Sequence, residues 1–149
     1  MEIKLIESNK KDFLDLLLLA DEEEKMIDKY LERGDLFALY DDDLKSTCVV
    51  TDEGEGVFEL QSLATYPVFQ GQGYGKRIVS YVVDYYWDKG KRMILGTGDV
   101  PGILGFYESC GFVISHKVEN FFIEHYEEPI FEEGIQLKDK VYLTMDLNK

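Results

Sequence analysis

Apolar residues recur with two different periods near the start of the chain, and these periods predict its first elements. Residues 2–6 alternate between apolar and polar side chains, which is typical of a short strand. From 11 to 33 the apolar residues recur at helical spacing, and the acidic run Asp21–Glu24 divides this stretch into two expected helices. Gly34 is a natural residue to end the second helix.

The rest of the chain begins with strands and continues with alternating helices and strands. Polar turns separate three strands, expected as an antiparallel meander at 35–40, 44–51 and 57–65. The pattern then predicts a helix over 74–88, a strand over 92–96, a helix over 103–110, a strand over 111–116 and a strand over 140–147. It assigns no element to 117–139. This order indicates an α/β (α+β) fold, a mixed sheet with helices on both faces.

Composition limits the class of protein. A chain of 149 residues fits one domain, expected over 1–149, and its 45% hydrophobic residues can form a core without metal or disulfides. Cys48 and Cys110 belong to no Cys/His cluster, so we expect no metal site and a reducing, cytoplasmic compartment. The N-terminus does not resemble a signal peptide, and the apolar run at 14–20 is too short to span a bilayer.

The balance of charge excludes further classes. Acidic residues outnumber basic ones, 30 to 16, for a formal net charge of -14. This excess argues against binding to nucleic acid or to anionic membranes. An acidic field attracts cationic substrates such as amines, although it can also serve solubility alone.

A glycine-rich turn at Gln70–Lys76 reads QGQGYGK and lies between a strand and an amphipathic helix. The start of a helix offers unpaired backbone N–H groups and the positive end of the helix dipole, and glycines let a phosphate approach them. A pyrophosphate is therefore the natural ligand. Gln70 and Arg77 exclude a Walker A motif, and the GxGxG spacing does not fit the dinucleotide fingerprint. A loop without a ligand is the alternative.

Two stretches resemble the signatures of the GNAT acetyltransferases. The first, LATYPVFQGQGYG at Leu63–Gly75, matches their core positions with Gln70, Gly73 and Gly75. The second, GFYESCGF at 105–112, is similar to their second hallmark. The resemblance implies a GNAT fold with a mixed, largely antiparallel sheet. It also implies an N-acetyltransferase whose co-substrate is acetyl-CoA.

The resemblance also places this co-substrate. Backbone N–H groups from Gly71 to Lys76 would hold the CoA pyrophosphate, and the backbone of Leu63–Thr65 would pair with the pantetheine arm as an added strand. Asp99 stands where many relatives have an Asn that contacts the pantetheine. The residues expected to bind the cofactor are Leu63, Ala64, Thr65, Gln70, Gly71, Gln72, Gly73, Tyr74, Gly75, Lys76 and Asp99.

Two catalytic roles follow from the same resemblance. Tyr107 would be the general acid toward the departing CoA thiolate, because a phenol with a pKa of about 10 is protonated at neutral pH. Glu59 would be the general base toward the amine, and an exposed strand carboxylate is the alternative. If the strand is regular, Glu59, Gln61 and Leu63 share one face, whereas a β-bulge would change that register. Cys110 is expected to be a buried apolar side chain rather than a nucleophile.

The acceptor is expected to be a small-molecule or peptide amine. His125, Tyr126 and Glu128 are candidates to line its pocket, and the alternative for them is a surface or dimer-contact segment. Homodimers are frequent among the proteins that this chain resembles, and residues 121–131 could contribute to one. The alternative to an enzyme is a noncatalytic acyl-CoA-binding module that acts as a sensor or interaction partner.

Overall fold

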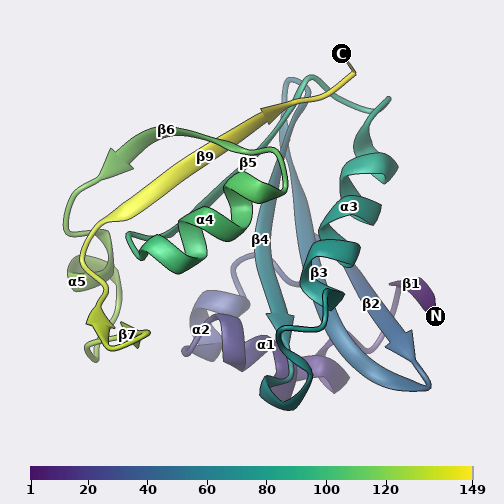
Figure 1. The fold of residues 1–149 in the computed structure, drawn as a ribbon, viewed down its shortest axis with the longest axis horizontal. Helices are drawn as coiled ribbons and strands as arrows, with labels where there is room; N and C mark the ends of the chain where they lie inside the picture. Colours follow the sequence, from purple (N-terminus) through teal and green to yellow (C-terminus); the bar gives the residue numbers. More distant parts are fainter. Residues whose placement is uncertain (149) are drawn as a thin grey trace.

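The computed structural model describes residues 1–148 and shows a seven-stranded sheet with helices on both faces (Figure 1). The strand order is β1-β2-β3-β4-β5-β9-β6. Every neighbouring pair of strands is antiparallel except β4 and β5, which are parallel. The predicted α+β fold with a mixed, largely antiparallel sheet is confirmed.

The elements follow the predicted order. The strands are β1 (Glu2–Ile6), β2 (Asp35–Asp41), β3 (Asp43–Gly54), β4 (Val57–Thr65), β5 (Arg92–Gly98), β6 (Val113–Val118), β7 (Phe131–Glu132), β8 (Ile135–Gln136) and β9 (Lys140–Asp146). The helices are η1 (Lys10–Phe13), α1 (Leu14–Ala20), α2 (Glu24–Ile27), η2 (Pro67–Phe69), α3 (Tyr74–Tyr86), α4 (Pro101–Ser109) and α5 (Phe121–His125). The second helix is shorter than expected, because turns replace it after Ile27.

Two hydrophobic clusters join the helices to the sheet. On one face α3 and α4 cover the larger cluster, which includes Phe37, Leu60, Ile78, Val82, Tyr107, Phe112 and Leu143. On the other face α1 and α2 cover a smaller cluster, which includes Leu17, Ile27, Leu36 and Val49. Burial of these apolar surfaces supplies the main stabilising term of such a domain.

The parallel pair β4 and β5 is joined along only part of its length. Its ladder runs from the pair Val57 and Arg92 to the pair Leu60 and Leu95, and then stops. Beyond this point the two strands run apart, as Figure 1 shows, and β5 continues beside β9 as far as Gly98. The end of β4 therefore has one edge without a strand beside it.

A β-bulge interrupts β4 at the fork. Val49 pairs with Ser62 and Val50 pairs with Leu60, so Gln61 is one extra residue in β4. Side chains alternate between the two faces of a sheet along a strand. One extra residue shifts this alternation, so residues before and after the bulge that would share a face in a regular strand point to opposite faces.

The bulge changes which face of the sheet Glu59 occupies. Glu59 lies opposite Thr51, whereas Leu63 lies opposite Cys48, a residue of the α3 cluster. Thr51 and Cys48 are three residues apart, so they point to opposite faces. Gln61 stays on the side of Glu59, since its Nε2 donates to Thr51 Oγ1 at 3.1 Å. Glu59, Gln61 and Leu63 would share one face of a regular strand. Because of the bulge, Leu63 instead points to the face opposite Glu59 and Gln61.

A buried lysine fixes the irregular segment after α2. The Lys10 side chain is 9% exposed, and its ammonium donates to the carbonyl oxygens of Leu31 at 3.1 Å, Glu32 at 3.1 Å and Gly34 at 2.6 Å. These three bonds use all three N–H groups of the ammonium. Lys10 thereby satisfies carbonyls that no helix or strand pairs.

We expect Lys10→Met to lower the free energy of unfolding by about 2 to 3 kcal/mol, because it leaves these carbonyls without a partner. Urea denaturation followed by circular dichroism measures the change. Lys11→Met is the matched control, since Lys11 forms exposed ion pairs with Glu24 and Asp28, and its effect should be clearly smaller. Equal losses for the two variants would contradict the role assigned to Lys10.

Candidate functional site

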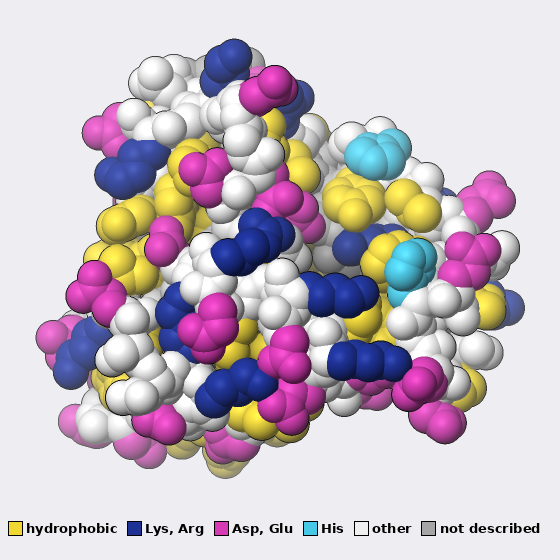
Figure 2. All heavy atoms as spheres, turned by 180° about the vertical axis from the view of Figure 1, so that it is seen from behind, with side chains coloured by type: hydrophobic (Ala, Val, Ile, Leu, Met, Phe, Trp, Pro, Cys, Tyr) yellow, Lys and Arg dark blue, Asp and Glu magenta, His cyan; other side chains and the backbone are white. Residues whose placement is uncertain are grey.

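A cavity of about 960 Å³ occupies the opening between β4 and β5. The end of β4, the glycine-rich turn, the start of α3 and part of α4 form one side of it. Segments around α1, α2, α5 and β7 form the other side. In Figure 2 the surface is hollowed beside the histidine side chains, where hydrophobic and basic side chains meet.

The glycine-rich turn has the geometry of an anion site. Gly71 and Gly73 have φ values of 78° and 89°, which glycine adopts readily, and a Cβ at either position would meet no atom within 4 Å. Gly73 is the N-cap residue of α3, so the amides of the residues that follow have no carbonyl four residues earlier in the helix. The first turn of α3 carries no acidic residue.

Contacts with β2, β3 and β4 hold this turn in place. Gln70 Nε2 donates to the Thr65 carbonyl at 3.1 Å, which ties the turn to the end of β4. The Tyr74 hydroxyl donates to Asp41 Oδ2 at 2.7 Å, and the Lys45 ammonium lies 3.5 Å from the centre of the Phe69 ring. The free amides are therefore fixed before any ligand arrives.

The end of β4 offers its free edge to the cavity. On its other edge β3 holds it, where Ser46 Oγ donates to the Ala64 carbonyl at 2.7 Å. The residues Leu63, Ala64 and Thr65 all line the cavity. An extended ligand can pair with such an edge through main-chain hydrogen bonds.

Tyr107 is packed against the wall of the same cavity. Its ring lies edge-on to Phe106 at 5.1 Å and to Phe112 at 6.2 Å between centroids. Tyr107 is 9% exposed and lines the cavity. Burial raises the pKa of its phenol, so the hydroxyl keeps its proton at neutral pH.

Glu59 is a half-buried carboxylate on the α1 and α2 side of the fork, and it lines the cavity. Burial raises the pKa of Glu59, and the nearby charges of Lys140 and Arg33 partly oppose this rise. Arg33 is itself paired with Glu53 at 3.0 Å. Glu59 has no ion-pair partner within 4 Å in the described part of the chain.

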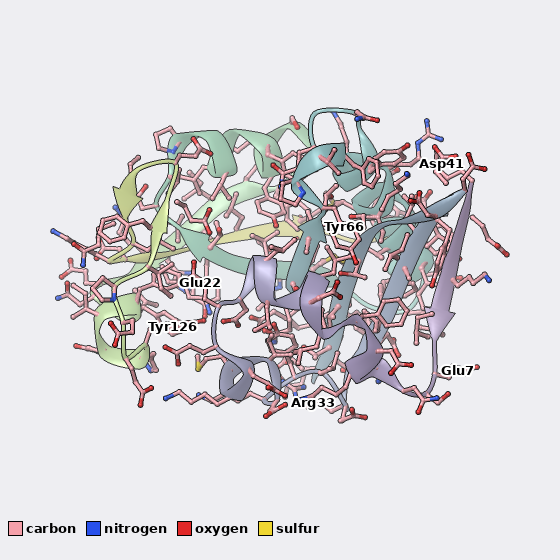
Figure 3. The ribbon with its side chains drawn as sticks, turned by 90° about the horizontal axis from the view of Figure 1, so that it is seen from below. Glu7, Glu22, Arg33, Asp41, Tyr66 and Tyr126 are labelled. Carbon is pink, nitrogen blue, oxygen red and sulfur yellow. The ribbon has the colours of Figure 1, made fainter. Side chains whose placement is uncertain are left out.

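The segment after β6 closes the far end of the cavity. The Tyr126 hydroxyl donates to Asp21 Oδ1 at 2.9 Å, which joins residues 105 positions apart. Figure 3 shows Tyr126 on the same side of the molecule as Glu22, the residue that follows Asp21. The Glu127 amide donates to Glu23 Oε2 at 3.0 Å. On its other side the segment packs through Val100, Ile130 and Leu137.

Most of the predicted site residues lie on the cavity wall, but three do not. Gln72 is exposed in the turn, and Asp99 forms an exposed ion pair with Lys117 at 3.0 Å. Glu128 is exposed outside the wall, whereas His125 and Tyr126 belong to it. The cofactor contacts expected of Gln72 and Asp99 therefore stay predictions from the sequence.

Several wall residues were not predicted from sequence, namely Asp21, Tyr30, Phe121, Phe122, Glu132 and Lys140. Asp21 comes from the acidic run after α1, and Phe121, Phe122 and Glu132 come from the unassigned segment, whose aromatic and acidic richness was the available signal. Tyr30 follows α2 and Lys140 begins β9, and only the tertiary fold brings these two to the wall. Cys110 is partly buried, and burial raises the pKa of its thiol, which favours an unreactive packing role.

Two further classes of site were sought among residues 1–148. No group of three or more His, Cys, Asp or Glu side chains there is arranged to hold a metal ion. No helix in this part of the chain is long and apolar enough to cross a membrane.

The chain is similar to known acetyltransferases along nearly its whole length. It is 35% identical over 150 residues to the "Uncharacterized N-acetyltransferase YvbK" of Bacillus subtilis (strain 168), covering 99% of this chain and 97% of that protein. The crystal structure of a Bacillus subtilis acetyltransferase in complex with CoA has a TM-score of 0.90 at 34% identity, with 98% of each chain covered.

A GNAT family acetyltransferase from Elizabethkingia anophelis, solved with acetyl-CoA bound, gives a TM-score of 0.92 at 34% identity. The comparison covers 98% of this chain and 97% of that one. The profile of the Acetyltransferase (GNAT) family matches residues 4–112, which include β1 to α4 and both signature stretches. This chain is a member of the GNAT family of N-acetyltransferases.

Proposed function

We propose that residues 1–149 form one acetyltransferase domain that moves an acetyl group from acetyl-CoA directly to a primary amine. The observation that carries the proposal is the fork between β4 and β5, with the amide-lined turn at one end of its cavity and Glu59 and Tyr107 on its walls. The CoA and acetyl-CoA complexes of the two similar structures support the choice of co-substrate.

The co-substrate would enter from the α3 side. The amides of Gly71–Lys76 hold the pyrophosphate, and the positive end of the α3 dipole adds to the attraction. The backbone edge of Leu63–Thr65 pairs with the pantetheine arm. This path delivers the thioester to the fork, between Tyr107 on one side and Glu59 on the other.

The reaction needs three proton transfers, two from the acceptor nitrogen and one to the leaving thiolate, and one stabilised oxyanion. Glu59 removes a proton from the acceptor ammonium, directly or through water, so that the amine nitrogen can attack the acetyl carbonyl. A backbone N–H of the Leu63–Thr65 strand donates to the developing oxyanion. As the carbon–sulfur bond breaks, Tyr107 donates its proton to the leaving thiolate, and the second proton that the attacking nitrogen loses returns through water to the Tyr107 phenolate. The products are an N-acetyl amine and CoA.

The direct test is release of free thiol from acetyl-CoA across a panel of amines, with the acetylated product identified by mass spectrometry. We expect turnover with at least one primary amine. Binding of CoA without turnover of any amine, including a cell-extract pool, would instead support the noncatalytic acyl-CoA-binding module.

The pyrophosphate site is tested by two substitutions whose side chains are equal in size and differ in charge. Gly73→Asp and Gly73→Asn both suit a positive φ better than other residues, and neither Cβ meets an atom of the protein. We expect Gly73→Asp to weaken CoA binding at least about 100-fold, through charge repulsion, and Gly73→Asn to weaken it much less. Isothermal titration calorimetry measures both, and equal affinities would place the pyrophosphate elsewhere.

The acid role of Tyr107 is tested by removing its hydroxyl. Tyr107→Phe keeps the ring contacts and should lower kcat about 100-fold while the Kd of acetyl-CoA stays the same. Steady-state kinetics and calorimetry measure the two quantities. Tyr81→Phe, on the exposed side of α3, is the control. Unchanged kcat in Tyr107→Phe would remove the acid assignment.

The base role of Glu59 predicts a pH dependence. Because a base must be ionised and burial raises the pKa of Glu59, kcat/KM should fall with decreasing pH at a higher pH than an ordinary Glu, whose pKa is about 4.3. Glu59→Gln should abolish this fall of kcat/KM at low pH and lower kcat about 100-fold or more. Glu55→Gln, in an exposed turn, is the control. A pH profile that survives Glu59→Gln would point to another base.

A further inference from the structure

Two carboxylates at the far end of the cavity lack a cationic partner. Asp21 follows α1 and Glu132 belongs to β7, and both line the cavity. Within residues 1–148 neither forms an ion pair within 4 Å, and the donors to the Asp21 side chain are neutral: the phenols of Tyr126 at 2.9 Å and Tyr30 at 3.5 Å and the backbone amide of Glu23. Both carboxylates are partly withdrawn from water.

The surroundings make this end of the cavity strongly negative. Burial raises the pKa of Asp21 despite its hydrogen bonds, and the charge of Glu23 adds to the rise. Burial also raises the pKa of Glu132, with further contributions from Glu22 and Glu133. A bound cation would relieve the cost of keeping these carboxylates ionised.

A buried hydroxyl without a hydrogen bond provides a second, independent sign of a ligand. Ser62 is 4% exposed and lines the cavity, and its Oγ has no hydrogen-bond partner in the described part of the chain. It interacts with the Tyr30 phenol, but the two hydroxyls do not meet ordinary hydrogen-bond geometry. Buried polar atoms are seldom left in this state, so the Ser62 hydroxyl is free to meet a polar group in the cavity.

These groups form a continuous path to the proposed catalytic base. Ser62 pairs with Val49 and Glu59 pairs with Thr51, so both lie on the same face of the sheet. From Ser62 the path continues through Tyr30 to Asp21. An acceptor of a few carbon atoms can therefore extend from the fork toward the acidic end.

The basic residues of the cavity do not neutralise that end. Arg33 is paired with Glu53, and the Lys140 ammonium lies 4.3 Å from the centre of the Phe121 ring, on the side of Glu59. Lys29 lines the wall from an exposed position. The acidic end is instead faced by aromatic rings, including those of Tyr30 and Tyr126, which favour a cation.

We propose that the acceptor carries two cationic amines, one that reacts beside Glu59 and a second that remains protonated and binds between Asp21 and Glu132. The inference rests on the proposed acetyltransferase function and names the chemical class of its acceptor. Asp21 and Glu132 are specificity residues, because they contact the far end of the acceptor and not the reacting atoms.

Three probes of one chain length test this assignment: 1,4-diaminobutane, n-butylamine and 4-aminobutyrate, whose second group is cationic, absent or anionic. We expect kcat/KM for the diamine to exceed that for butylamine by about tenfold or more, and aminobutyrate to be the poorest. Diamines with three and five carbons are tested as well, because the distance between the two amine sites decides which chain length fits best. A preference for butylamine or aminobutyrate over all three diamines would overturn the proposal.

Two substitutions locate the second amine. Asp21→Asn and Glu132→Gln should each raise KM for the preferred diamine by about tenfold and reduce its advantage over butylamine, with the loss in KM rather than in kcat. Glu128→Gln removes an equal charge from an exposed position outside the cavity and should keep the wild-type preference. A diamine preference that survives both Asp21→Asn and Glu132→Gln would place the second amine elsewhere and overturn the assignment.

Binding measurements separate failure of this inference from failure of the proposed function. If no probe is acetylated, calorimetry of the three probes with the CoA-loaded protein must still rank the diamine first, and equal or absent binding overturns the inference. The proposed function fails separately, if CoA itself does not bind or no amine of any kind releases thiol from acetyl-CoA.

Discussion

The incomplete ladder between β4 and β5 is the constraint on which the rest of the molecule depends. A sheet leaves backbone N–H and C=O groups unpaired at a fork, and such groups are costly unless a partner or water satisfies them. Here the ladder stops after Leu60 and Leu95, and helices pack against both faces of the sheet. The open edge is thus a stable part of the fold, and the cavity, the amide turn and the proposed reactive groups are arranged around it.

The fork divides the molecule into two chemical sides. Toward α3 lie free amides, a helix start without acidic residues, and Lys76, all suited to an anion. Toward α1, α2 and β7 lie carboxylates and aromatic rings, which favour a cation. A negatively charged co-substrate and a positively charged acceptor would therefore reach the reacting position from opposite directions, each attracted to its own side.

The sequence predicted the parts of this arrangement that depend on local pattern. The bounds of β4 and the start of α3 follow from alternation and from a glycine turn ahead of an amphipathic stretch. Asp21 and Glu132 could not be assigned to one cavity from the sequence, because only tertiary packing brings the loop after α1 and the hairpin at β7 to the same wall. The segment at 117–139 escaped assignment because its elements, α5, β7 and β8, are too short to show a period.

The extra residue in β4 has a consequence for how this strand tolerates change in evolution. If β4 kept Gln61 but paired with β3 in a regular ladder from Ser62 onward, Gln61 would lie opposite Val50 and Glu59 opposite Asp52, which turns Glu59 toward the apolar cluster under α3, away from the acceptor side. A shift of one residue in β4 is therefore more damaging to the site than most replacements of a side chain. Insertions and deletions should be rarer between 59 and 63 than in the exposed turn at 54–56, which no cavity residue depends on.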